Sequence, residues 1–78
     1  MENEQEWQKT VKRLRATLRR RLTIAKQEPQ TAEKWKLVLE QVQIGTAYFL
    51  RYGWPDWWSE FQRAEDDAVW ALRGLERW

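Results

Sequence analysis

The chain of 78 residues contains no cysteine and no histidine. Without cysteine it forms neither a disulfide nor a thiolate metal site, and without histidine it has no imidazole to act as a base or a metal ligand. Its only serine, Ser59, therefore has no imidazole to activate it as a nucleophile. These absences predict a protein that is not an enzyme, with no catalytic residues, no metal site and no cofactor.

Glycine, proline and long apolar stretches are also scarce. The three glycines stand apart from one another, so the chain has no glycine-rich loop of the kind that binds phosphate groups. No uninterrupted apolar run approaches the length that crosses a bilayer. The first residues lack the charged, apolar and small regions of a signal peptide. We therefore expect a cytoplasmic protein with no membrane span and no small-molecule substrate.

Tryptophan is abundant, with seven residues in a chain whose mean hydropathy is −0.91. A chain this short buries only about 60% of its unfolded surface, so it needs large apolar side chains or a second subunit to build a stable core. Each aromatic side chain buries about 150–250 Å² when it is fully covered. The composition predicts a single helical domain over residues 1–78, held together by a few aromatic anchors.

The first predicted helix covers residues 4–27. From Trp7 to Ala25, apolar residues recur at spacings of three and four, which is the period of one helix face. Asn3 and Glu6 resemble a capping box at the start of this helix. Pro29 ends it, because a residue before proline is displaced from helical backbone angles.

Two further helices are predicted, at residues 32–52 and 55–77. Thr31 is the expected N-cap of the second helix, and Gly53 offers a left-handed residue after its end. Pro55 suits the first position of the third helix. The turns between the helices are short, so the predicted fold is an all-α, three-helix antiparallel bundle.

The middle helix is apolar on two sides and needs cover from two directions. We therefore expect the protein to be dimeric or part of a complex. The predicted contact consists of the second apolar side of this helix, namely Leu37, Gln41, Ile44 and Tyr48. Gly45 in mid-helix costs about 1 kcal/mol relative to alanine. It either permits close approach of helices at that contact or makes room for a tryptophan ring within one protomer.

Basic residues are concentrated in the first helix. Between Lys9 and Lys26 there are eight lysines and arginines and no acidic residue. Cations in rows along a rigid helix bind phosphates by releasing counterions, with little sequence preference. The candidate phosphate contacts are Lys9, Lys12, Arg13, Arg15, Arg19, Arg20 and Lys26. Two alternatives are a solvated face partly neutralised by the acidic third helix, and attachment to an anionic membrane surface.

Two side chains stand apart from these patterns. Arg21 lies beside the apolar seam of the first helix, where we expect it to pair with a carboxylate of the third helix rather than to extend into solvent. Trp70 lies opposite the apolar side of the third helix, with Arg73 close enough to stack on it. Exposed in this way, Trp70 and Arg73 would suit a protein interface or the stacking of a nucleobase, unless the C-terminal tail covers the ring.

The sequence thus predicts a small, non-catalytic accessory or regulatory protein that binds nucleic acid phosphates through its first helix. The alternative is a protein-binding module, such as an inhibitor, an antitoxin-like partner or an adaptor. Its contacts would be Trp70 and the second apolar side of the middle helix. The carboxylates of the third helix do not indicate a metal site, because consecutive residues on a helix point in different directions. The predicted partners are DNA or RNA and a protein or a second copy of this chain.

Overall fold

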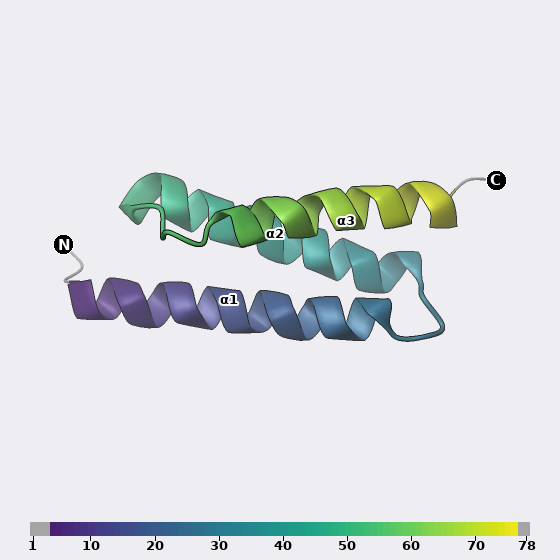
Figure 1. Ribbon diagram of the computed structural model, residues 1–78, viewed down its shortest axis with the longest axis horizontal. Helices are drawn as coiled ribbons and strands as arrows, with labels where there is room; N and C mark the ends of the chain where they lie inside the picture. The colour runs from purple at the N-terminus through teal and green to yellow at the C-terminus, as the bar shows by residue number, and fades with distance from the viewer. Residues whose placement is uncertain (1–3, 77–78) are drawn as a thin grey trace.

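Three α-helices make up the computed structural model, which describes residues 4–76. They are α1 (Glu4–Lys26), α2 (Ala32–Tyr52) and α3 (Ser59–Leu75). Figure 1 shows the chain doubling back at each of the two turns, and the molecule measures 47 × 19 × 17 Å. The predicted all-α bundle of three helices is therefore confirmed. Within the described residues no helix is long and apolar enough to cross a membrane.

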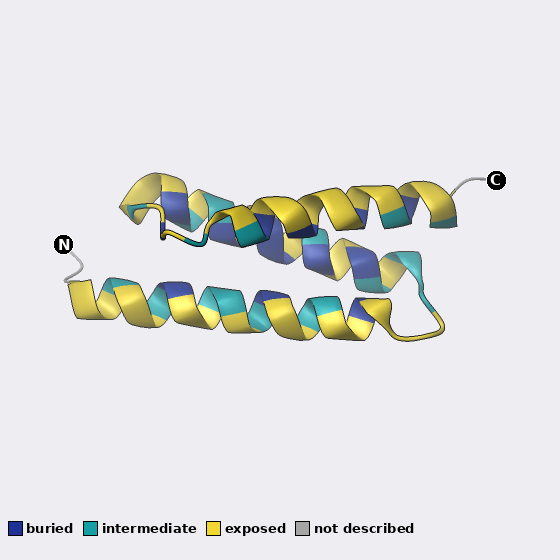
Figure 2. Cartoon of the chain, viewed as in Figure 1, coloured by how far each residue is buried: buried dark blue, intermediate teal, exposed yellow. Residues whose placement is uncertain are grey.

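The central element is α2, which packs along both other helices, whereas α1 and α3 touch each other at few positions. Figure 2 shows that each helix turns its buried residues toward the other two and leaves its outer side exposed. This arrangement follows from the apolar patterns: α2 is apolar over a wide arc, while α1 and α3 each have one apolar side. The apolar residues that α2 buries therefore serve both neighbouring helices.

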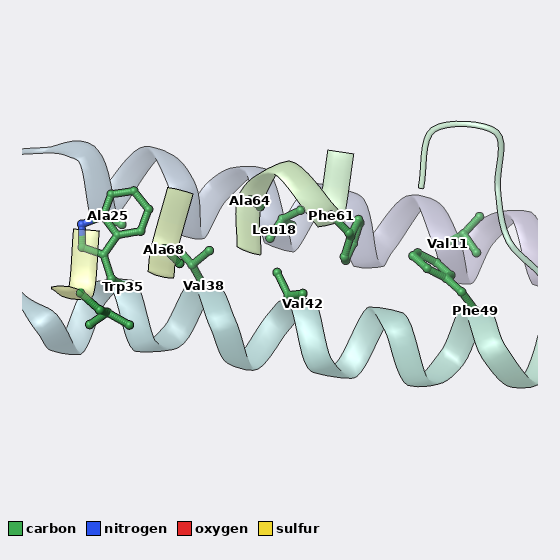
Figure 3. Close-up of a cluster of buried hydrophobic side chains, with 11 residues drawn as sticks. Val11, Leu18, Ala25, Trp35, Val38, Val42, Phe49, Phe61, Ala64 and Ala68 are labelled. Atoms are coloured by element: carbon green, nitrogen blue, oxygen red, sulfur yellow. The ribbon is translucent and has the colours of Figure 1, made fainter. Parts of the chain in front are cut away.

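The core runs along the whole length of the bundle (Figure 3). Trp35 of α2 lies at one end beside Ala25, and Phe49 of α2 lies at the other end with Val11. Most of the large core side chains come from α2 and the start of α3, whereas α1 and the middle of α3 contribute smaller ones. Burial of these side chains removes apolar surface from water and fixes which side of α1 and of α3 faces outward. The fully or nearly fully buried set is Val11, Leu18, Ala25, Trp35, Val38, Val42, Phe49, Phe61, Ala64, Ala68 and Leu72.

Gly45 makes room for an aromatic ring within one protomer. A Cβ atom added at Gly45 would lie 2.8 Å from Cδ2 of Phe61 and would also collide with Cε2 of the same ring. Phe61 is held there by an edge-on contact with Phe49, at 5.0 Å between ring centroids. Gly45 therefore accommodates an aromatic ring of the same protomer, as one of the two interpretations predicted. The ring is a phenylalanine of α3 and not a tryptophan.

The turn between α1 and α2 and the end of α2 match the predicted boundaries. The Thr31 hydroxyl accepts a hydrogen bond from the Lys34 backbone N–H at 3.3 Å, so Thr31 is the N-cap of α2. Gly53 has a positive φ of 122° with an extended ψ of 150°, which is a glycine conformation but not the left-handed helical one predicted. The predicted cap at Asn3 lies outside the described residues.

The predicted start of α3 at Pro55 is wrong by four residues. After Pro55 the chain forms a tighter turn, in which the Trp58 N–H donates to the Pro55 carbonyl at 3.0 Å, and the α-helix begins at Ser59. This turn keeps Trp54 and Trp57 in contact with Phe49, at centroid distances of 5.7 and 6.0 Å. The packing of these aromatic rings therefore determines where α3 begins, and it outweighs the preference of proline for the first position of a helix. The predicted end at residue 77 lies outside the described residues.

Candidate functional site

The seven predicted phosphate-binding residues all lie on α1, and none belongs to the residues that this helix buries. Six of them are exposed, and Arg15 is partly buried. The apolar residues of α1 bind this helix to α2, so its opposite side is directed outward (Figure 2). The seven cations are not equally available to a ligand, however, because two of them form ion pairs within the protein.

Arg15 and Arg19 both bind the carboxylate of Glu60 at the start of α3. Arg15 Nη2 lies 2.9 Å from Glu60 Oε1, and Arg19 Nε lies 2.9 Å from Glu60 Oε2. The Arg15 guanidinium also stacks on the Trp57 ring, at 4.6 Å from its centroid. This cluster joins α1 to α3 where the two helices otherwise make few contacts. In the folded protein these two arginines are engaged by the protein itself.

The charge of Glu60 is stabilised by this cluster. Partial burial acts to raise the pKa of Glu60, but hydrogen bonds from Arg19 and Arg15 and the charges of both arginines outweigh it, so the pKa lies below its ordinary value. The same hydrogen bond to Glu60, followed by its charge, raises the pKa of Arg19. Glu60 is therefore ionised near neutral pH.

The other five cations form what we call the basic face of α1: Lys9, Lys12, Arg13, Arg20 and Lys26. All five are exposed, and none has an ion pair or a side-chain hydrogen bond with another described residue. From Lys9 to Lys26 the face extends about 25 Å along the helix axis, at 1.5 Å per residue. This is a line of uncompensated positive charge on a rigid support.

Arg21 does not pair with α3 as predicted. Its Nη1 donates to the Leu37 carbonyl at 3.0 Å and lies 4.0 Å from Glu40 Oε2, so both partners belong to α2. The reason is its position around the helix, because Arg21 lies on the edge of α1 that faces α2. It is part of the packing between these two helices.

The predicted contact on α2 is only partly available at the surface. Leu37 and Ile44 are 47% and 46% exposed, and Tyr48 is partly buried with its ring 4.6 Å from that of Tyr52. Gln41 is the exception, because it is buried and its Nε2 donates to the Leu14 carbonyl of α1 at 3.3 Å. Gln41 therefore stabilises the α1–α2 packing within one protomer. Because it is buried there, it does not belong to the exposed surface of α2, contrary to the prediction.

Trp70 and Arg73 lie on α3, on a different side of the bundle. Trp70 is 70% exposed, and the Arg73 guanidinium lies 5.5 Å from its ring centroid. Beside them is a hollow of about 870 Å³ that is also lined by Val69 and by Leu39 of α2. The sequence pattern predicts an exposed Trp70 but not this hollow, because Leu39 and Val69 are distant in sequence. The candidate protein interface thus consists of two separate surfaces, one on α2 and one on α3.

The carboxylates of α3 do not converge. Within residues 4–76, no three acidic residues come close enough together to hold a metal ion. Glu60 is bound by the two arginines, and Glu76 lies 3.4 Å from Lys36.

Comparison of the chain with protein-family models, with curated proteins and with solved structures found no match. The surfaces of the protein that could bind a partner are the basic face of α1, the exposed side of α2 and the outer surface of α3.

Proposed function

We propose that this is a small, non-catalytic accessory or regulatory protein that binds the phosphates of a nucleic acid in the cytoplasm through the basic face of α1. The observation that carries the proposal is the state of the five cations: they are exposed, they lie along one helix, and no described carboxylate neutralises them. A protein that used these charges only to stabilise its fold would pair them, as it pairs Arg15 and Arg19 with Glu60.

Phosphates fit the basic face better than a single anionic ligand does. The five cations are spread over about 25 Å of helix and do not converge on one point. A nucleic acid offers a line of phosphates, and each contact releases condensed counterions. Side chains that bind the backbone alone give affinity without sequence readout. The protein is therefore proposed to coat or position a nucleic acid, and not to select a base sequence.

Replacing three cations of the basic face tests the proposal. The triple variant Lys9→Glu, Arg13→Glu and Arg20→Glu removes the outermost row. A matched control, Lys36→Glu, Arg51→Glu and Arg63→Glu, has the same net charge but changes exposed residues of α2 and α3. Fluorescence anisotropy of a labelled duplex at low salt should show that the first variant has lost at least about 100-fold in affinity, since each phosphate contact contributes separately. The control should lose far less. Equal losses would mean that net charge alone causes binding, and the basic face would not be a site.

The second candidate function is protein binding through the exposed side of α2. It is favoured by Leu37 and Ile44, which are both nearly half exposed on a helix that is otherwise buried on two sides. In this case Ile44→Glu should abolish co-purification of a partner while leaving thermal stability and duplex binding unchanged. If the same partner is retained by Ile44→Glu, this side of α2 is not its binding surface.

A further inference from the structure

The outer surface of α3 between Asp66 and Arg73 has a charge order that complements itself. Asp66 and Arg73 are exposed, and they lie at equal distances on either side of a point between Val69 and Trp70. Neither Asp66 nor Arg73 has an ion pair with a described residue, and the Arg73 guanidinium lies over the Trp70 ring. We propose that two copies of this chain form a two-fold dimer in which their α3 helices pack antiparallel, with Trp70 at the centre.

The register follows from the spacing. A two-fold axis that passes between Val69 and Trp70 places each residue of one α3 level with the residue equally far beyond the axis on the other. Asp66 therefore faces the partner's Arg73, and Arg73 faces the partner's Asp66, each about 5 Å along the helix from the axis. A two-fold interface uses the same patch on both subunits, so it requires a patch that is complementary to itself. The acid–aromatic–base order of α3 meets this requirement without any further protein.

Trp70 can pack into a hollow on the partner copy. Trp70 is 70% exposed, and the hollow of about 870 Å³ beside it is lined by Leu39 and Val69 and by the nearly buried Leu72. In the dimer, Trp70 of each copy covers the hollow of the other, which removes both rings from water. Tryptophan and arginine at the centre of a contact, with charged pairs around them, are typical of the residues that dominate interface affinity.

The dimer goes beyond the proposed binding of phosphates and does not depend on it. The surface from Asp66 to Arg73 lies opposite the buried side of α3, so it points away from α1. The basic face therefore stays accessible in both copies, and one dimer presents two such faces. A nucleic acid long enough to reach both would bind with the avidity of two linked sites.

Charge reversal in two different variants tests the register directly. In Asp66→Arg the two ion pairs become contacts between arginines, and in Arg73→Asp they become contacts between carboxylates. When the two variants are mixed, the heterodimer restores both opposite-charge pairs. The control is Asp67→Arg, which makes the same charge change at an exposed neighbour that points about 100° away around the helix. Dimerisation of all three variants is measured by sedimentation equilibrium without nucleic acid, and circular dichroism checks that each variant keeps its helices.

We expect the wild type and Asp67→Arg to dimerise, and Asp66→Arg and Arg73→Asp alone to dimerise at least about tenfold more weakly. Their equimolar mixture should recover the wild-type dissociation constant. Trp70→Ala should weaken the dimer by about 30-fold or more. A wild type that stays monomeric into the millimolar range overturns the proposal. A dimer that tolerates Asp66→Arg and Trp70→Ala, or a mixture that shows no recovery, overturns it as well. None of these results bears on the basic face, since no nucleic acid is present.

Discussion

Replacing Gly45 with alanine should destabilise the protein, although alanine is the better helix former. In an open helix the change would stabilise by about 1 kcal/mol. Here the new Cβ would lie 2.8 Å from Cδ2 of Phe61, where carbon atoms normally stay about 3.5–4.0 Å apart. The ring cannot retreat freely, because Phe49 and Trp57 flank it at centroid distances of 5.0 and 6.1 Å.

The balance of these two effects sets the magnitude. Overpacking a filled core typically costs about 1–3 kcal/mol. After the gain in helix propensity, we expect the free energy of unfolding to fall by about 1 kcal/mol. For a domain of this size, each kcal/mol corresponds to roughly 4–8 °C in melting temperature. Thermal unfolding followed by circular dichroism resolves such a shift easily.

Gly74 provides the matched control. It is exposed near the end of α3, and a Cβ atom there would meet nothing within 4 Å. Gly74→Ala should therefore raise stability by about 0.5 kcal/mol. If Gly45→Ala stabilises as much as Gly74→Ala, the contact with Phe61 does not constrain this position and the reasoning fails.

A double-mutant cycle identifies the cause of the loss at Gly45. Phe61→Leu removes the ring, so Gly45→Ala should cost less, or even stabilise, in that background. We expect a coupling energy of about 1 kcal/mol. If Gly45 instead allowed close contact between two copies, the loss would vary with protein concentration, because dissociation of a dimer depends on mass action. The structure predicts a loss of stability that is independent of protein concentration.

Two further predictions concern the helix cap and the cluster between α1 and α3. Thr31→Ala should cost about 1 kcal/mol in thermal or urea unfolding, while Thr31→Ser should cost little because it keeps the hydroxyl; equal losses would remove the cap from the account. Glu60→Gln should weaken the links to Arg15 and Arg19 and destabilise the protein by about 1 kcal/mol at neutral pH. Because the pKa of Glu60 is lowered in the folded state, the stabilisation is complete above its unfolded pKa of about 4.3 and is lost as the pH falls through the folded value. The melting temperatures of wild type and Glu60→Gln should therefore converge in acid, and a constant gap down to pH 3 would contradict the role of this charge.

The helices could be predicted from the sequence because their signals are local. Apolar spacing from Trp7 to Ala25, the threonine before α2 and the glycine after it each act within a few residues, and the structure places those boundaries as predicted or within one residue. The start of α3 could not be predicted in this way. It depends on the packing of Trp54 and Trp57 against Phe49, which brings two elements together.

The candidate site was predictable in outline but not in its pairing. The cations of α1 are evident in the sequence, yet nothing local shows that Glu60 engages Arg15 and Arg19 from a position more than 40 residues away. The burial of Gln41 was hidden for the same reason, since its partner is a backbone carbonyl of another helix. Residue spacing predicts which side of a helix a residue occupies, whereas its partner on another helix is known only from the packed bundle.

The most direct test of the account is the salt dependence of duplex binding. A labelled duplex of about one helical turn is titrated at several salt concentrations, so that only one basic face can engage it. Each phosphate contact contributes a slope of about −0.9 to the logarithm of the binding constant against the logarithm of salt. The five cations of the basic face therefore predict a clearly negative slope, no steeper than about −4.5, that flattens by about 3 in the variant with Lys9, Arg13 and Arg20 replaced by glutamate. No binding at low salt, or a slope that this variant leaves unchanged, would contradict the claim that α1 binds phosphates.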